Sequence, residues 1–123
     1  MRKWSVYAVG QDGDWLEAIR QLDGDGIRVR GAIRGSDYVK RLGRIPRGER
    51  KALLLIIDAA GQRELIQTIQ QLRRQGWRHV VVVATAPSPG QTHAVLHDAG
   101  ASDIWRKSYT PAVIRRYFDE CLV

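Results

Sequence analysis

One carboxylate stands out at the end of the most apolar stretch of the chain. Asp58 follows six consecutive apolar residues, 52–57, and precedes Ala59-Ala60-Gly61. A short, β-branched apolar run is typical of a strand buried on both faces, as in the centre of a parallel sheet. Open α/β sheets bind ligands at the carboxyl ends of such strands. The residues alone leave two interpretations of Asp58 open: a functional carboxylate at the sheet edge, or an N-cap of the next helix.

Positive charge is concentrated in one segment, residues 28–51. The chain has 20 Lys and Arg residues against 13 Asp and Glu residues, and its formal net charge is +7. Nine basic side chains lie in this segment beside two acidic ones, so the segment carries the whole net charge. It is either a solvated basic face or a docking surface for phosphates or an acidic partner. The candidate contact residues are Arg34, Lys40, Arg41, Arg44 and Arg47.

Direct nucleic-acid binding by this basic segment has little support in the sequence. Tyr38 is its only aromatic residue, which gives bases little to stack on. No helix-turn-helix or other DNA-reading motif is evident. We therefore expect a protein rather than a nucleic acid as the direct partner.

Strands and helices are expected to alternate along the chain. Apolar runs predict five strands, over residues 3–9, 27–33, 52–57, 79–84 and 103–106. Helical spacing and stop signals predict five helices, over residues 15–22, 37–42, 61–75, 91–99 and 111–122. This alternation predicts an α/β fold, a parallel five-stranded sheet covered by helices on both faces.

Local patterns add two finer expectations. The second strand alternates Ile27, Val29, Gly31 and Ile33 with Arg28, Arg30 and Ala32, so it should have one wetter face and lie at a sheet edge. N-caps are expected before the first two helices. The candidates are Asp12 or Asp14 for the first helix, and Ser36 or Asp37 for the second.

Length, hydropathy and cysteine content limit the possible classes of protein. A chain of 123 residues, 44% hydrophobic, suits one domain with a real core. No apolar run approaches the about 20 residues of a membrane span, and the N-terminus lacks the features of a signal peptide. The single cysteine, Cys121, cannot form an internal disulfide, which fits a reducing, cytoplasmic setting.

The carboxyl-terminal third carries a pattern that resembles a known family. Ala99-Gly100-Ala101 is followed by a polar pair, a short strand and Lys107-Ser108-Tyr109, and Thr85-Ala86 follows the preceding apolar strand. With Asp58, this pattern resembles the receiver domain of bacterial two-component response regulators, over nearly the whole chain. The resemblance implies a flavodoxin-like (βα)5 fold, doubly wound with three α/β/α layers, and one receiver-like domain over residues 1–123.

The resemblance also implies roles for three residues. Asp58 falls on the phosphoacceptor aspartate, Thr85 on the switch hydroxyl and Lys107 on the lysine that contacts the phosphoryl group. Positive charge and hydrogen-bond donors of this kind stabilise the oxygens of an added phosphoryl group. In the family a divalent metal supplies the remaining charge, held by the aspartate and by an acidic pair after the first strand. The alternative is that Asp58 and Lys107 only form an ion pair.

The sequence departs from the family pattern at the expected metal site. Gly10 and Gln11 stand where the acidic pair should be, and Asp12 follows one position late. Asp12 and Asp58 would therefore form at most a weak Mg²⁺ site, and no cofactor is firmly implied. The loop after Asp58 is shorter than in the family, and Ile104 stands where the family has its aromatic switch residue.

We therefore expect an atypical receiver domain, not an enzyme, with phosphorylation at Asp58 absent or inefficient. Its expected partner is a histidine kinase or another signalling protein. The fourth helix, fifth strand and fifth helix form the expected interface, for such a partner or for a homodimer. Mixed charges and aromatic residues suit an interface, and they are Trp105, Arg106, Arg115 and Tyr117. Two alternatives stay open: a working phosphoacceptor with a rearranged Mg²⁺ site, and a basic adaptor that binds nucleic acid.

Overall fold

The computed structural model describes residues 4–10, 13–24, 26–35, 37–57, 62–84 and 90–106. Five strands are present within these ranges: β1 (Trp4–Gly10), β2 (Ile27–Arg34), β3 (Leu53–Ile57), β4 (His79–Ala84) and β5 (Asp103–Arg106). The helices described there are α1 (Gly13–Arg20), α2 (Tyr38–Leu42), α3 (Gln62–Arg74) and α4 (Gly90–Ala99), with a 3₁₀ turn, η1 (Arg47–Glu49). The expected final helix, over residues 111–122, lies outside the described residues.

The five strands form one parallel sheet in the order β2-β1-β3-β4-β5. β3 is the central strand, as its apolar run predicted, and Leu53 to Ile56 are fully buried. β2 is an edge strand, as its exposed arginines predicted. Parallel strands connected by helices in this order make the flavodoxin-like fold, so the predicted fold class is confirmed.

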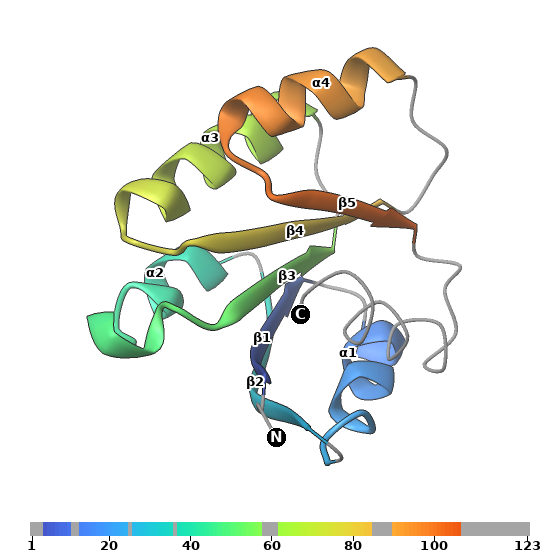
Figure 1. Ribbon diagram of the computed structural model, residues 1–123, viewed down its shortest axis with the longest axis vertical. Helices are drawn as coiled ribbons and strands as arrows, with labels where there is room; N and C mark the ends of the chain where they lie inside the picture. The colour runs from blue at the N-terminus through green and yellow to red at the C-terminus, as the bar shows by residue number, and fades with distance from the viewer. Residues whose placement is uncertain are drawn as a thin grey trace.

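Helices cover both faces of the sheet, which gives the molecule three layers (Figure 1). Side chains of a strand alternate between faces, so β3 contributes to two separate cores. Leu53 and Leu55 pack with Trp15 and Ile19 of α1, in what we call the α1-side core. Leu54 and Ile56 pack on the other face with α2, α3 and α4, in the α3-side core, whose helical residues are Leu42, Leu65, Ile69, Leu72 and Leu96.

A β-bulge interrupts the pairing of β2 with β1. Val6 pairs with Val29, but Tyr7 pairs with Gly31, so Arg30 is an extra residue on β2. A bulge changes the face to which the following side chains point. Val29 accordingly packs against the α1-side core, whereas Ile33 packs against the α3-side core. The predicted alternation, which placed Val29 and Ile33 on one face, is therefore wrong beyond Arg30.

The turn between α4 and β5 is fitted closely to the end of α3. Gly100 has a φ of +124°, and a Cβ atom on it would lie 2.7 Å from Cγ of Arg73. Arg73 in turn donates from Nη1 to the carbonyl oxygens of Trp77 (3.1 Å) and Arg78. Only glycine has both the backbone freedom and the small volume for this position, which accounts for Ala99-Gly100-Ala101.

Two details of the helix termini differ from the sequence-based expectation. α1 begins at Gly13, so Asp14 lies inside its first turn and is not its N-cap. Asp37 does occupy the N-cap position of α2, but its side chain makes no capping hydrogen bond. Asp12 and Ser36 lie outside the described residues. None of the helices in the described part of the chain is both long and apolar enough to span a membrane.

Candidate functional site

The three candidate phosphorylation residues directly follow neighbouring strands. Asp58 comes after the last residue of β3, Thr85 after the last residue of β4, and Lys107 after the last residue of β5. These strands are parallel and adjacent, so their carboxyl ends meet at one edge of the sheet. The side chains of Asp58, Thr85 and Lys107 lie outside the described residues, and their predicted roles stay predictions.

The same sheet edge carries an arginine close to the expected metal site. β1 ends at Gly10, which pairs with Arg34 at the end of β2. Nη1 of Arg34 lies 3.1 Å, and its Cζ 3.3 Å, from the position that a Cβ atom on Gly13 would occupy. The guanidinium group therefore lies next to the first residue of α1.

The residues near this edge form a poor donor set for magnesium. Mg²⁺ prefers carboxylate oxygens and water, and the chain offers only Asp12 between Gly10 and Gly13. The Arg34 guanidinium next to Gly13 repels a divalent cation. The described residues contain no group of three or more His, Cys, Asp or Glu side chains that could hold a metal ion. Asp12 and Asp58 themselves lie outside that set.

A shallow pocket of about 160 Å³ lies between α1 and β2. Its lining residues are Gly13, Leu16, Glu17, Arg20, Ala32 and Arg34. Pockets for drug-sized ligands are usually concave spaces of about 300–1,000 Å³, so this pocket is smaller than that range. It shows only that Arg34 is accessible from the α1 side of the sheet.

The structure places Ile104, which the resemblance compares with an aromatic residue of receiver domains, on β5. It is half-buried and packs against the α3-side core.

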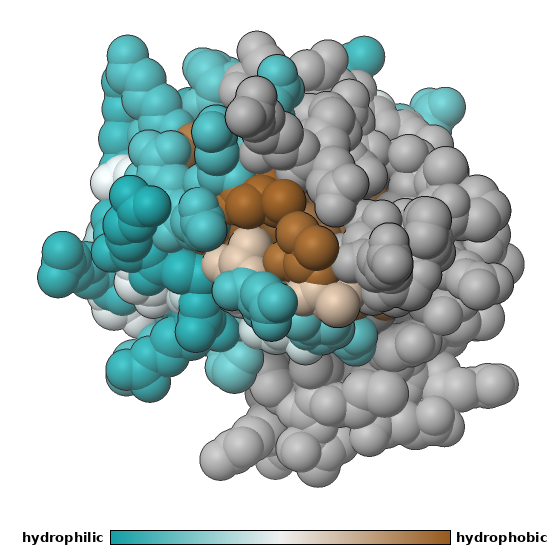
Figure 2. All heavy atoms as spheres, turned by 90° about the horizontal axis from the view of Figure 1, so that it is seen from above, coloured by the Kyte–Doolittle hydropathy of each residue, from teal (hydrophilic) through white to brown (hydrophobic). Residues whose placement is uncertain are grey.

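The predicted interface lies only in part within the described residues. Trp105 and Arg106 belong to β5, but their side chains are not described, and Arg115 and Tyr117 lie outside the range. On the neighbouring helix α4, Val95 is 38% exposed, the largest exposure of a bulky apolar side chain in the described part of the chain. Seen from the side of α3 and α4, the surface shows a small apolar patch among hydrophilic side chains (Figure 2). Our sequence analysis missed Val95, because one exposed apolar residue does not disturb a helical pattern.

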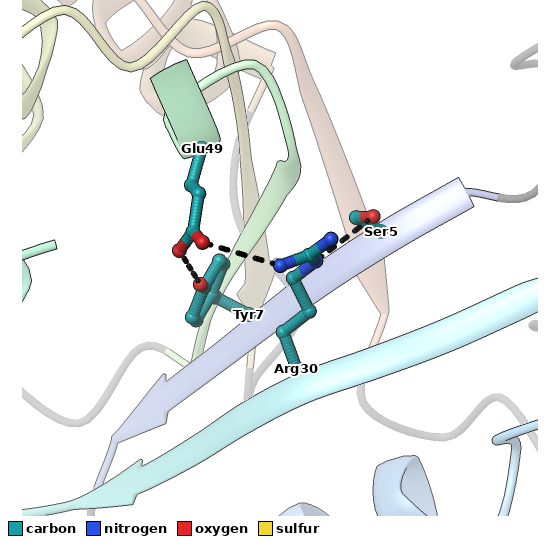
Figure 3. Close-up of polar contacts among 4 residues, drawn as sticks. All are labelled: Ser5, Tyr7, Arg30 and Glu49. Carbon is teal, nitrogen blue, oxygen red and sulfur yellow. Dashed lines mark hydrogen bonds and ion pairs between the residues drawn. The ribbon is translucent and has the colours of Figure 1, made fainter. Parts of the chain in front are cut away.

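A polar cluster links β1, β2 and η1 (Figure 3). The Tyr7 hydroxyl donates to Oε2 of Glu49 at 2.9 Å, and Arg30 pairs with Oε1 of Glu49 at 3.3 Å. Nε of Arg30 also donates to Oγ of Ser5 at 3.2 Å. Burial raises the pKa of Tyr7, and the hydrogen bond to Glu49 and its negative charge raise this pKa further. The bulge at Arg30 thus directs one arginine of the basic segment into an intramolecular network.

Another arginine of the basic segment, Arg50, is buried in the fold. Arg50 is 9% exposed and donates to the backbone carbonyl oxygens of Gly43 (3.0 Å), Ile45 (3.0 Å) and Gln75. Carbonyl groups that follow helices carry partial negative charge, which compensates the buried guanidinium. Arg50 therefore fixes the loop after α2 to the end of α3. No sequence pattern indicated this role, because Arg50 lies among other basic residues.

The remaining seven basic residues of the segment are all exposed. They are Arg28, Arg34, Lys40, Arg41, Arg44, Arg47 and Lys51. Arg30–Glu49 is the ion pair found in this segment among the described residues. These seven exposed residues are called the basic surface below. They include all five candidates from the sequence: Arg34, Lys40, Arg41, Arg44 and Arg47.

Sequence comparisons identify no relative of this chain. A scan of protein-family models found no match, and a search of curated proteins found none either.

Comparisons with solved structures do find similar folds. The receiver domain of a modulated diguanylate cyclase from Desulfovibrio desulfuricans G20 is similar at a TM-score of 0.69 and 15% identity, over 95% of this chain and 91% of that one. A LuxR-family two-component response regulator from Aurantimonas sp. SI85-9A1 is similar at a TM-score of 0.73 and 17% identity, over 98% of this chain and 85% of that one. A pilus assembly protein, CpaE from Caulobacter crescentus CB15, is similar at a TM-score of 0.73 and 14% identity, over 94% of this chain and 91% of that one.

These likenesses extend over nearly the whole chain. The predicted fold is thereby confirmed. The chain has the fold of a response regulator receiver domain.

Proposed function

We propose that this chain is an atypical receiver domain, covering residues 1–123, that transmits a signal through protein–protein contacts and not through catalysis. Phosphorylation at Asp58 is absent or inefficient in this proposal. The observation that carries it is the contact of the Arg34 guanidinium with Gly13, at the start of α1. A guanidinium next to the start of α1, close to a segment that supplies one carboxylate in sequence, disfavours the binding of Mg²⁺.

Two further features support the same proposal. The first strand is followed by Gly10-Gln11-Asp12, which supplies one carboxylate where the family supplies two. Ile104 on β5 replaces the aromatic residue that responds to phosphorylation in the family. A domain without these parts can still act as a signalling module if a partner recognises its surface. A histidine kinase or another signalling protein is the proposed partner, and the α4–β5 face with Val95 is a proposed contact region, for it or for a second copy.

Phosphotransfer from a small donor tests this proposal directly. The folded protein is incubated with acetyl phosphate and Mg²⁺, and its intact mass is measured beside that of Asp58→Asn and of a receiver domain with a complete acidic pair. We expect the mass to stay unchanged while the reference domain gains one phosphoryl group. A gain of one phosphoryl group that is lost in Asp58→Asn would overturn the proposal and establish a working phosphoacceptor with a rearranged metal site.

A double variant tests the stated physical cause. Gln11→Asp combined with Arg34→Ala restores a second carboxylate and removes the nearby cation. We expect this variant to bind Mg²⁺ more tightly than the unchanged chain, by titration calorimetry. Equal binding of Mg²⁺ by both proteins would show that Arg34 and Gln11 do not limit the site.

A further inference from the structure

The basic surface is the largest concentration of exposed like charge in the described part of the molecule. Its seven cations lie along β2, α2 and the chain around η1, and β2 is the edge strand of the sheet. Asp37 is the exposed carboxylate of this segment, because Glu49 is engaged by Tyr7 and Arg30. Folding therefore engages Arg30, Arg50 and Glu49 internally and leaves seven cations and Asp37 exposed.

The backbone that carries these cations is fixed at three points. Glu49 and Arg30 join η1 to β2. Arg50 joins the loop after α2 to α3 through the carbonyl oxygens of Gly43 and Gln75. Arg41 donates from Nη1 to the carbonyl oxygen of Arg34 at 3.3 Å, which joins α2 to the end of β2. A charged surface on a fixed backbone costs less ordering on binding than a charged flexible loop.

Side chains engage three backbone groups of the edge strand β2. The backbone N–H of Val29 donates to Oδ1 of Asp23 at 2.8 Å. The carbonyl oxygens of Ala32 and Arg34 accept from Arg20 (3.4 Å) and Arg41 (3.3 Å). These contacts compete with β-sheet extension at this edge and favour recognition through side chains and charge.

The local structure favours an acidic polypeptide over a nucleic acid. α2 has five residues, which is too short for a recognition helix in a major groove. Tyr38 is half-buried against the α3-side core, so the basic surface offers no stacking platform for bases. Arginine guanidinium groups pair well with carboxylates, often through two hydrogen bonds.

We propose that the basic surface is a docking site for an acidic segment of a protein partner. This surface shares Arg34 with the carboxyl edge of the sheet, but the proposal does not depend on whether Asp58 accepts a phosphoryl group. Charge complementarity of this kind raises the association rate and selects the partner.

Fluorescence anisotropy with charged probes tests the proposal. The full chain is titrated against a labelled peptide of about ten glutamates, and against an oligothymidine of about the same charge, at low and at physiological salt. We expect the peptide to bind at low salt, more tightly than the oligothymidine, and to weaken as salt is added.

Matched charge reversals locate the binding surface. Lys40→Glu with Arg44→Glu changes two basic-surface residues whose side chains make no described hydrogen bond. Arg74→Glu with Arg78→Glu makes the same change of charge at exposed positions, at the end of α3 and just before β4. We expect the first pair to weaken peptide binding about tenfold or more and the second pair by less than about twofold. Circular dichroism and thermal melting confirm that both variants are folded.

Three outcomes would overturn the proposal. Equal loss in both double variants would show that binding follows net charge and has no defined surface. Tighter binding of the oligothymidine, lost in Lys40→Glu with Arg44→Glu, would identify a nucleic-acid surface instead. No binding of the peptide at low salt would leave the seven cations as a solvated face.

Discussion

At the scale of single residues, the arginines of residues 28–51 show how one residue type serves different purposes. Arg30 is in an intramolecular ion pair, Arg50 is buried against backbone carbonyls, and Arg44 is exposed. The bulge positions Arg30 and the loop positions Arg50, and the charge pattern of the sequence marks neither role. The charge of a segment therefore overstates the charge that its surface offers to a partner.

Tyr7→Phe tests the polar cluster at the residue scale. The substitution removes the hydrogen bond from the Tyr7 hydroxyl to Glu49 but keeps the ring, which packs edge-on against Trp77 with ring centres 5.5 Å apart. We expect the free energy of unfolding at neutral pH to fall by about 1 kcal/mol, the usual net value of such a bond. Urea denaturation measures this free energy of unfolding. An unchanged free energy would show that water replaces the hydrogen bond without cost.

The same variant carries a pH dependence. The pKa of Tyr7 is raised above 10.0 in the folded protein, so the unfolded chain releases this proton first as the pH rises. The contribution of Tyr7 to the free energy of unfolding is fully present below the pKa that Tyr7 has in the unfolded chain. It is lost as the pH rises through the pKa that Tyr7 has in the folded protein. We expect wild type to lose unfolding free energy above pH 10.0 more steeply than Tyr7→Phe. Parallel curves for the two proteins would refute this.

At the scale of secondary-structure elements, Arg50 joins α2, η1 and α3. Arg50→Met removes three hydrogen bonds and leaves the carbonyl oxygens of Gly43, Ile45 and Gln75 without this donor. We expect a loss on the order of 3 kcal/mol in the free energy of unfolding, by chemical denaturation.

The matched control for Arg50 is Arg44→Met, at an exposed position of the same loop. We expect it to change stability by less than about 0.5 kcal/mol. Similar losses in both variants would mean that the charge, and not the buried hydrogen bonds, stabilises this part of the fold.

The sequence was sufficient to predict the strands whose apolar pattern is strong. Residues 79–84 and 103–106 were predicted as strands and match β4 and β5. In β2 the prediction failed after Arg30, because a bulge adds a residue without any signature in a strand of alternating arginines. η1 was missed for a related reason: three residues with no periodicity cannot be recognised from pattern alone.

The candidate site was predictable only as far as the strand ends. The apolar runs before Asp58 and Thr85 placed both residues at one sheet edge, and the strand order agrees. The contact of Arg34 with Gly13 could not be predicted, because it depends on how β2 and α1 approach each other in space. Long-range contacts between a flexible side chain and a glycine leave no trace in local sequence.

At the scale of the whole molecule, the uneven charge has a cost for stability. A formal net charge of +7, gathered along one edge, makes the folded protein repel itself. We expect the free energy of unfolding to rise by up to about 1 kcal/mol when salt is raised from about 20 to about 200 mM, because salt screens exposed charges. In the double variant Lys40→Glu with Arg44→Glu, which carries less net positive charge, the free energy of unfolding should rise less with added salt. A fall in stability with added salt would show that attractive ion pairs dominate.

The division of the fold into two cores has a spectroscopic consequence. Trp15 is buried in the α1-side core, and Trp77 is buried in the α3-side core, on the opposite face of the sheet. Each layer thus contains its own fluorophore, shielded from water in the native state. With the other tryptophans replaced by phenylalanine, the emission of Trp15 or Trp77 reports on one face alone, and the two signals together show whether both layers melt in a single transition.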